Sequence, residues 1–451
     1  MGFRGMRHCE RRILAFFISV LTLVDITSFV IAREDTQPNI LLILADDVGS
    51  EVPQCYGGES YATPRIDQLA QEGMRFEHAY AMAVCHPTRI CLLSGQYPFR
   101  MGNPKWGSYP ESAEANTIAQ VLKNAGYATA VAGKWQIGML GEDLSQPNRL
   151  GFDEYCLFGW HEGPRYYQPL IWQNGKNRED VKEKYGPDVY CDFLIDFIQR
   201  HREKPFFAYY PMALCHAVTN DLDKPVPVGP NGRYQTFGEM VEAMDERVGR
   251  MVDAVDQAGL RDNTLVVFLT DNGSPAKNID GVRNGELIYT PVSSIRNGTV
   301  IPGGKAQLTD AGTRVPMIVR WPGKIPADSK CDDLIDVSDF LPTLAEVAGG
   351  ELPSGITLDG RSFANRLEGE GSGPREWVFA EHKENAFVKD RRWKLFSDGR
   401  LYDVQEDSNE QSPLKIGDVP HADSRAASQL NEAIHELFAA GLPRRDSQLQ
   451  E

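Results

Sequence analysis

The chain has 451 residues, 41% of them hydrophobic, and a formal net charge of −16 at pH 7. This length suffices for a large buried core, and the acidic balance disfavours nucleic acid as a partner. The eight cysteines show no spacing typical of a disulfide framework or a zinc site. Six of them remain when Cys9 and Cys85 are set aside, and these six could pair in an exported protein.

The first 32 residues have the composition of a secretory signal. Arginines at positions 4, 7, 11 and 12 precede an apolar run over residues 13–24, and small or branched residues end the segment at Ala32. Asp25 interrupts the run, which is shorter than the roughly 20 residues that a membrane span requires. We therefore predict a signal peptide over residues 1–32, export to the periplasm or the extracellular space, and no membrane association after cleavage.

Four apolar runs are each followed by polar residues. The runs are continuous rather than alternating, which predicts strands buried on both faces of a parallel sheet. Ligands bind at the carboxyl ends of such strands in α/β proteins. The runs and the polar residues after them are 38–44 with Asp46 and Asp47, 127–132 with Lys134, 204–210 with His216, and 263–270 with Asp271 and Asn272. Taken singly, these residues are also common in turns, helix caps, cores and surfaces.

Helical patterns alternate with these strands, at residues 63–73, 117–124, 192–202, 237–259 and 336–348. Strands that alternate with helices predict an α/β fold. From about residue 349 the pattern changes to short strands at 377–380, 386–389, 393–396 and 400–404, followed by a helix at 423–439. The sequence contains no repeats and no low-complexity tract.

The segment Cys85-His86-Pro87-Thr88-Arg89 begins another predicted helix. Pro87 suits the first turn of a helix, so Cys85 is placed at a helix N-terminus, which stabilises negative charge. Arg89 lies one turn further on and can return its guanidinium toward Cys85 to hold an anion. The alternative is a structural cysteine, because free cysteines are among the most buried residues.

Two further groups of residues fit an anion and a cation at one place. Asp46, Asp47, Asp271 and Asn272 offer only oxygen ligands, which suit Ca²⁺ or Mg²⁺ rather than zinc. Lys134 follows a strand and lies between glycines, and Lys305 follows Gly303 and Gly304, an arrangement that lets the backbone approach a ligand.

These motifs together resemble the formylglycine-dependent sulfatases, an arylsulfatase-like family of the alkaline phosphatase superfamily. The resemblance begins with C-x-P-x-R before Leu92-Leu93-Ser94-Gly95 and extends over roughly residues 38–407. It includes Gly133-Lys134-Trp135-Gln136-Ile137-Gly138, where sulfatases typically have His in place of Gln136. It also includes Gly151-Phe152-Asp153-Glu154-Tyr155, and Arg392-Trp393-Lys394-Leu395 with Leu401-Tyr402-Asp403-Val404.

The resemblance implies an alkaline phosphatase-like α/β fold with a large mixed, mostly parallel sheet sandwiched by helices. A smaller C-terminal α+β subdomain on a short antiparallel sheet would follow, giving a catalytic domain over residues 33–350 and a C-terminal subdomain and tail over residues 351–451. It further implies an exported sulfuric ester hydrolase acting on a sulfated small molecule or polysaccharide.

The resemblance also implies a role for each site residue. Cys85 would be converted to formylglycine by a formylglycine-generating enzyme, and the cation would be Ca²⁺, with Mg²⁺ the less favoured ion. Cys85, Arg89, Lys134, His216 and Lys305 would be catalytic, and Lys134, His216 and Lys305 would also bind the substrate. The metal ligands would be Asp46, Asp47, Cys85, Asp271 and Asn272. Gln136 cannot take up a proton, which leaves the base for sulfate release open, with His86 and water as candidates.

Two alternatives remain open from the sequence. A phosphoester hydrolase could use the same scaffold, although a zinc phosphatase would need several histidines and the nine of this chain do not cluster with the aspartates. A non-catalytic protein that binds sulfated glycans would explain Gln136. The segments predicted to select the substrate, residues 160–188, 220–234 and 279–301, contain no recognisable motif.

Overall fold

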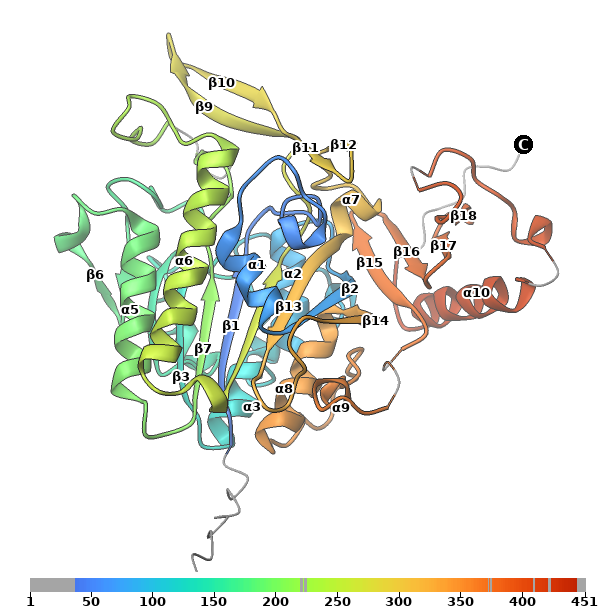
Figure 1. The fold of residues 1–451 in the computed structure, drawn as a ribbon, viewed down its shortest axis with the longest axis horizontal. Helices are drawn as coiled ribbons and strands as arrows, with labels where there is room; N and C mark the ends of the chain where they lie inside the picture. The colour runs from blue at the N-terminus through green and yellow to red at the C-terminus, as the bar shows by residue number, and fades with distance from the viewer. Residues whose placement is uncertain are drawn as a thin grey trace, which may run out of the picture. The chain divides into compact units, whose positions relative to one another are not determined.

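The computed structural model describes residues 37–443 except 220–221, 223–224, 372, 374, 409 and 421–422 (Figure 1). The predicted signal peptide at residues 1–32 lies outside the described residues. Among the helices that are described, none combines the length and the apolar character of a membrane span.

A ten-stranded sheet forms the centre of the molecule, in the order β14-β2-β13-β8-β1-β7-β3-β4-β5-β6. Strands β8, β1, β7, β3 and β4 pair in parallel, and β13 runs antiparallel to both of its neighbours. The predicted mixed, mostly parallel sheet is therefore confirmed. Its strands are β1 (Asn39–Ala45), β2 (Met74–Tyr80), β3 (Ala128–Lys134), β4 (Glu154–Phe158), β5 (Trp172–Gln173), β6 (Lys176–Asn177), β7 (Phe206–Pro211), β8 (Thr264–Thr270), β13 (Arg314–Arg320) and β14 (Ser329–Asp336).

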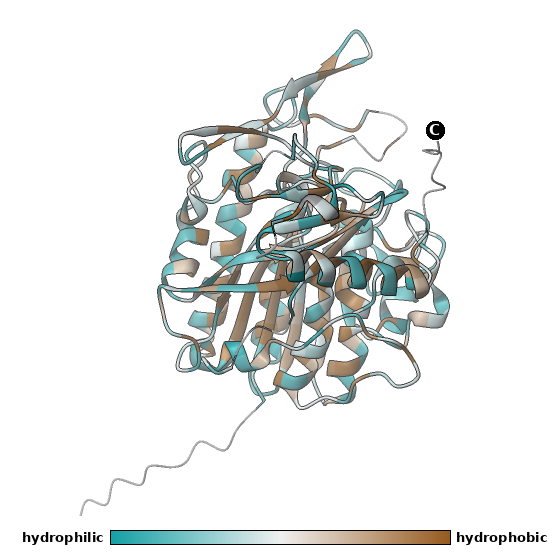
Figure 2. Cartoon of the chain, turned by 90° about the vertical axis from the view of Figure 1, so that its right-hand side faces the viewer, coloured by the Kyte–Doolittle hydropathy of each residue, from teal (hydrophilic) through white to brown (hydrophobic). Residues whose placement is uncertain are grey.

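Helices cover both faces of this sheet, because successive side chains of a strand point to opposite faces. Ile40, Leu42 and Leu44 of β1 belong to a core shared with α2 (Cys85–Ser94), α3 (Ile118–Asn124) and α8 (Phe340–Ala348). Leu41 and Ile43 belong to a second core, shared with α1 (Pro64–Gln71), α5 (Gly186–Arg200) and α6 (Phe237–Gln257). Figure 2 shows the resulting pattern, in which the central strands are the most hydrophobic part of the ribbon.

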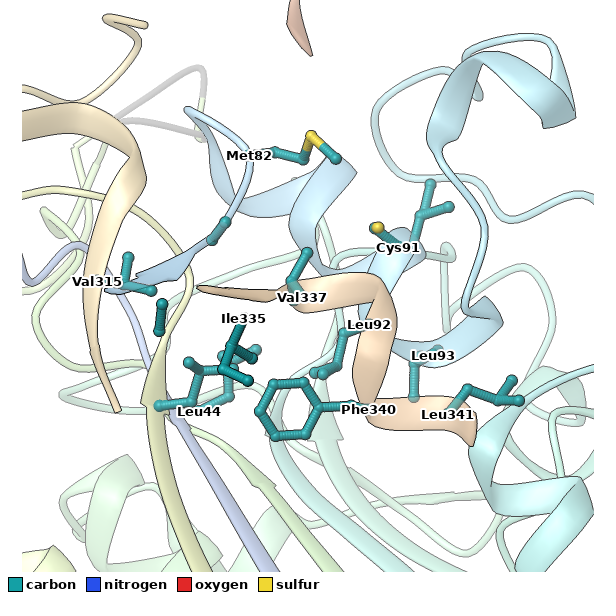
Figure 3. Close-up of a cluster of buried hydrophobic side chains, with 14 of the residues drawn as sticks. Leu44, Met82, Cys91, Leu92, Leu93, Val315, Ile335, Val337, Phe340 and Leu341 are labelled. Atoms are coloured by element: carbon teal, nitrogen blue, oxygen red, sulfur yellow. The ribbon is translucent and has the colours of Figure 1, made fainter. Parts of the chain in front are cut away.

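The apolar face of α2 is anchored in the first of these cores (Figure 3). Leu92 and Leu93 are buried beside Phe340 and Leu341 of α8. Truncating a buried leucine to alanine costs about 2–5 kcal/mol of folding free energy. This packing therefore fixes the position of α2, including its first residue, Cys85.

A separate four-stranded antiparallel sheet follows the main sheet in the chain. It consists of β15 (Val378–His382), β16 (Asn385–Lys389), β17 (Trp393–Phe396) and β18 (Leu401–Asp403), and it lies beside α10 (Ser424–Ala439) in Figure 1. The predicted smaller α+β part on a short antiparallel sheet is thus confirmed. Two hairpins, β9 (Lys277–Arg283) with β10 (Glu286–Pro291) and β11 (Ser293–Arg296) with β12 (Thr299–Pro302), occupy the segment that showed no motif.

Some boundaries differ from the sequence-based expectation. Helix α5 begins at Gly186 rather than at residue 192, because Pro187 occupies its first turn, where proline is well tolerated. Strands β2, β4 and β14 were not predicted as separate strands. The remaining short helices are α4 (Gln146–Arg149), α7 (Asp310–Thr313), α9 (Ala364–Leu367) and the 3₁₀ turns Gln54–Tyr56, Pro98–Met101, Glu111–Ala113, Glu179–Val181, Arg261–Asn263, Val337–Asp339 and Ile416–Asp418.

All seven cysteines within the described residues are free thiols. Six of them are buried, and only Cys55 is partly exposed. The disulfide pairing left open by the cysteine count therefore does not occur in this part of the chain.

Candidate active site

Four neighbouring parallel strands bring the predicted polar residues to one edge of the sheet. The register pairs Ala45 of β1 with Thr270 of β8, so the residues that follow them, Asp46 and Asp271, lie side by side. Strand β3 ends at Lys134, and His216 follows β7 after a short segment. The sheet order β8-β1-β7-β3 thus gathers side chains that are far apart in the sequence.

Cys85 is the first residue of α2 and has no exposed surface. Its sulfur and carboxylate oxygens of Asp46 and Asp271 all lie within 4.8 Å of one another. The Thr88 hydroxyl donates to the Asp271 carbonyl over 2.7 Å and so ties the first turn of α2 to the end of β8. Burial raises the pKa of the Cys85 thiol, which keeps this sulfur protonated at neutral pH.

Each of three buried carboxylates at this edge has a basic partner. The Lys134 ammonium donates to Asp46, and the Lys305 ammonium donates to Asp47 over 2.6 Å. Buried charges are stable only when they are paired in this way.

The third pair is formed by Arg89 and Asp271, whose Nη2 and Oδ2 atoms lie 2.8 Å apart. Arg89 also donates through Nη1 to the backbone carbonyl of Lys134 over 3.0 Å. Its guanidinium is therefore directed at the ends of two strands rather than at solvent.

The three carboxylates titrate differently because their surroundings differ. Burial opposes ionisation of Asp46, but the charges of Lys134, Arg89 and Lys305 outweigh it and lower its pKa. Burial raises the pKa of Asp47 in spite of Lys305. Burial and the charge of Asp46 raise the pKa of Asp271 to about 7. Bringing these three groups together therefore requires strong positive charge nearby.

The oxygen atoms at this edge fit a hard divalent cation. Asn272 donates through Nδ2 to Asp47 over 2.8 Å, so its Oδ1 atom takes no part in this hydrogen bond. Oδ1 of Asn272 and Oδ1 of Asp46 are buried, and neither accepts a hydrogen bond within the described chain. A buried acceptor without a donor costs about 1–3 kcal/mol. A cation would satisfy both atoms, and oxygen-only ligands are what Ca²⁺ and Mg²⁺ prefer.

Lys305 is positioned by backbone contacts. Its N–H donates to the Ser274 carbonyl over 2.9 Å, and the next residue, Ala306, donates to the Ala83 carbonyl over 2.8 Å. A Cβ atom on Gly303 would lie 2.0 Å from the Pro275 carbonyl oxygen, so no larger residue fits there. This glycine allows a close approach of protein backbone, rather than the approach to a ligand that was expected.

His216 is buried and is contacted through one ring nitrogen. Arg165 Nη1 lies 3.1 Å from Nδ1, and the Ala217 carbonyl lies 2.8 Å from the same atom. These contacts favour opposite tautomers, because arginine only donates and a carbonyl only accepts. Burial and the charges of Lys305, Lys134 and Arg165 keep the pKa of His216 well below its usual value, so the ring is neutral.

Arg165 was not predicted as a site residue. It lies in the segment 160–188, which was predicted to select the substrate because of its Gly, Pro, aromatic and charged residues, Arg165 among them, but no role was given to Arg165 itself. A single arginine in an irregular segment gives no sequence signal, and only its buried contact with His216 shows where it lies.

Gln136 and His86 differ in their surroundings. Gln136 adopts a left-handed backbone conformation with φ of 59°, and both polar atoms of its buried amide lack a hydrogen-bond partner in the described chain. His86 instead contacts the Ser108 carbonyl through Nε2 over 2.9 Å and stacks on Trp106. The His86 ring is thus committed to a different set of contacts from the carboxylates.

Two family profiles match the chain. The sulfatase profile matches residues 38–350, and the profile of the C-terminal part of N-sulphoglucosamine sulphohydrolase matches residues 304–437. The chain belongs to the sulfatase family. Members of this family are sulfuric ester hydrolases, and they generally depend on formylglycine and a divalent cation.

Characterised relatives extend over most of the chain. The N-acetylgalactosamine-6-O-sulfatase of Bacteroides thetaiotaomicron is 30% identical, over 90% of this chain and 92% of the relative. Human arylsulfatase A is 31% identical, over 76% of this chain and 70% of the relative. Human steryl-sulfatase is 28% identical, over 79% and 74% respectively.

Solved structures show the same fold. A sulfatase from Pseudoalteromonas matches with a TM-score of 0.69 at 21% identity, over 92% of this chain and 93% of the other. A protein from a study of glycosaminoglycan metabolism by Bacteroides thetaiotaomicron matches with a TM-score of 0.71 at 24% identity, over 90% and 100%. The chain therefore has the same overall fold as these structures.

Proposed function

We propose that this protein is an exported sulfatase that hydrolyses sulfate esters of a carbohydrate, with formylglycine formed at Cys85 and with Ca²⁺ as the cation. The observation that carries this proposal is the position of Cys85 at a helix N-terminus, with its sulfur close to the carboxylates of Asp46 and Asp271. The export part of the proposal rests on the composition of residues 1–32.

A carbohydrate substrate is supported by the relatives. The relative from Bacteroides thetaiotaomicron is, by its name, an N-acetylgalactosamine-6-O-sulfatase. Two structures of the same fold were solved as complexes with a neocarrahexaose and with a disulfated glucosamine. We extend this substrate class to the present chain.

The two groups that the protein needs would supply complementary chemistry. The hydrate of an aldehyde at position 85 would supply a hydroxyl nucleophile, after oxidation of Cys85 by a formylglycine-generating enzyme. A divalent cation held by Asp46, Asp47, Asp271 and Asn272 would supply concentrated positive charge for the sulfuryl oxygens.

The basic side chains complete the charge of the site. Three carboxylates face Lys134, Lys305 and Arg89, so the charges of these side chains balance without a cation. A divalent ion would then leave the pocket positive, as an anionic sulfate ester requires. In this scheme Lys134 and Lys305 hold the sulfuryl oxygens. Arg89 keeps Asp271 and the backbone of Lys134 in place.

His216 would act on the sulfate or on the leaving alcohol. Its Nε2 atom forms no hydrogen bond with the residues that the structure describes. Its Nδ1 atom lies within hydrogen-bond distance of Arg165 and of the Ala217 carbonyl. The tautomer that Arg165 favours has its proton on Nε2. This N–H can donate to a sulfate oxygen, or to the alkoxide oxygen as the ester bond breaks.

Gln136 would bind rather than transfer protons. An amide cannot take up a proton at neutral pH, so the base for the release of sulfate is not the residue at position 136. Its unpartnered amide is suited to donate to a sulfate oxygen instead.

The test is a mass spectrum of the peptide containing residue 85, combined with assays on matched sulfate and phosphate esters. The protein is made with its maturation enzyme. We expect an aldehyde at position 85, turnover of sulfate esters, and loss of at least 1,000-fold in kcat for Cys85→Ala, on the order of the effect of losing a nucleophile. Cys91→Ala, in the same helix, is the control.

Full activity of Cys85→Ala would overturn the proposal. A preference for phosphate esters would show that the protein is a phosphoester hydrolase instead of a sulfatase. An unmodified thiol and no turnover, in protein from the native host, would indicate a non-catalytic binder of sulfated glycans.

A further inference from the structure

A groove runs along the side of α2 next to the candidate site. It encloses a cavity of about 400 Å³, and its walls come from three separate parts of the chain. Val84 and His86, the two neighbours of Cys85, form one wall. Trp106 and Lys105 form the second wall, and Lys383 in the turn after β15 belongs to the third.

A row of aromatic rings leads from this groove to the loop after β4. His86 stacks on Trp106 with centroids 5.5 Å apart and an interplanar angle of 20°. Trp106 lies 5.4 Å from Trp160, which in turn lies 4.6 Å from His161. Trp160 and His161 belong to the loop after β4, and the same loop carries Arg165, the partner of His216.

The second ring of this row, Trp106, is open to solvent. Trp106 is 45% exposed, although an indole ring gains about 1.5–3 kcal/mol or more when it is buried. An exposed tryptophan in a concave wall is typical of a surface that binds a ring-shaped ligand. The apolar face of a pyranose ring matches the face of an indole.

The groove also carries local positive charge on an acidic protein. Lys105 and Lys383 are exposed, and neither forms an ion pair with a carboxylate of the described chain. The buried Glu381 carboxylate, also in this wall, accepts a hydrogen bond from the backbone N–H of Phe99 over 3.1 Å. Since the chain as a whole carries a charge of −16, two unpaired lysines here favour an anionic ligand at this position.

We propose that the groove binds a negatively charged sugar ring, next to the ring that loses its sulfate. The ring stacks on Trp106, and its sulfate or carboxylate group lies against Lys105 and Lys383. This inference rests on the proposed function, because it places the second ring relative to Cys85. Binding of this second ring makes the protein selective for polyanionic glycans over isolated sulfate esters.

The first experiment compares kcat/KM for three disaccharides. Each carries one sulfate on the reacting ring, and the second ring is neutral, sulfated or carboxylated. We expect the wild type to prefer one or both anionic forms by about tenfold, which is the effect of roughly 1.4 kcal/mol in binding. The two anionic arms distinguish sulfate from carboxylate as the recognised group.

The variants then test the groove itself. Lys105→Ala with Lys383→Ala should remove the preference for the anionic second ring, and Trp106→Ala should raise KM for all three disaccharides. Trp106→Phe should retain much of the binding. Lys176→Ala with Lys204→Ala, two exposed lysines elsewhere, make the same change in net charge and should retain the preference.

Binding measurements separate this inference from the proposed function. Cys85→Ala protein is titrated calorimetrically with the same disaccharides, so no turnover is required. A loss of affinity of about tenfold for the anionic forms in the lysine double variant supports the groove even if hydrolysis fails. Equal affinities for all three disaccharides, or a double variant that binds like its parent, would overturn the inference.

Discussion

Arg89 and Asp271 form a fully buried ion pair, with 2.8 Å between Nη2 and Oδ2. The second nitrogen of the guanidinium bonds the Lys134 carbonyl, so one side chain of α2 joins the ends of β8 and β3. We predict that Arg89→Lys lowers kcat/KM roughly 100-fold, because lysine keeps the charge but cannot make both contacts. Assays with a small aryl sulfate measure this effect.

Arg178→Lys is the control for this prediction. Arg178 pairs with Asp180, which is largely exposed, and surface pairs contribute about 0–1 kcal/mol. If Arg89→Lys and Arg178→Lys have the same kcat/KM, the two guanidinium contacts of Arg89 do not have the role assigned to them.

Removal of one unpartnered oxygen should weaken cation binding. Asn272→Ala deletes the buried Oδ1 atom and the hydrogen bond to Asp47. We expect its affinity for Ca²⁺ to fall about 10- to 100-fold, as for other changes around a bound metal. Calorimetric titration of chelator-treated protein measures the affinity, and Asn177→Ala at the exposed strand β6 is the control. Unchanged Ca²⁺ affinity in Asn272→Ala would exclude this residue from the ligands.

Gln136 should lower stability in the free protein and improve anion binding. Replacing it with leucine removes two buried polar atoms that have no partner. We therefore expect Gln136→Leu to raise the free energy of unfolding by about 1–3 kcal/mol. Added sulfate should then raise the Tm of the wild type more than that of the variant. A variant that is less stable than the wild type without sulfate would show that the amide is satisfied in solution.

We predict that the stability of the protein depends on pH through the carboxyl of Glu381. Burial is the main cause that raises its pKa to about 7, from an ordinary value of 4.5. The folded state therefore holds this proton longer than the unfolded state does. The stability that this one carboxyl contributes is fully present below about pH 4.5. This contribution is lost as the pH rises through about 7. The total effect is on the order of 3 kcal/mol.

Glu381→Gln should remove this dependence. Glutamine still accepts the hydrogen bond from Phe99, but it does not ionise. Urea unfolding of the variant at pH 5 and pH 8 should show a smaller difference than that of the wild type, by up to the same amount. Glu384→Gln, an exposed neighbour, should leave the difference as it is. Parallel pH profiles for the wild type and Glu381→Gln would refute this assignment.

Much of the candidate site was accessible from the sequence because parallel strands impose a simple rule. A buried strand is visible as a continuous apolar run, and the residue after it lies at the ligand-binding edge. Asp46, Lys134 and Asp271 were located in this way. Strands β2 and β14 were missed as such because they mix buried with partly exposed or exposed positions, so neither is a continuous apolar run, and they lie at one side of the sheet.

The remainder depends on contacts between distant segments. Arg165 lies in an irregular loop, and its contact with His216 arises from the tertiary fold. The groove joins Trp106 to Lys383, although no local pattern connects them. Gln136 was recognised as unusual, but its lack of a hydrogen-bond partner appears only in three dimensions.

The complete burial of Cys85 also has a consequence for the order of events during synthesis. Its enclosure depends on residues that emerge from the ribosome much later, including Asp271 beside its sulfur and Ala306, which bonds the backbone at Ala83. Until these residues are made, the nascent segment around Cys85 cannot be enclosed and stays open to other proteins. An enzyme that oxidises this cysteine must therefore act on the growing or unfolded chain, because the finished fold excludes it.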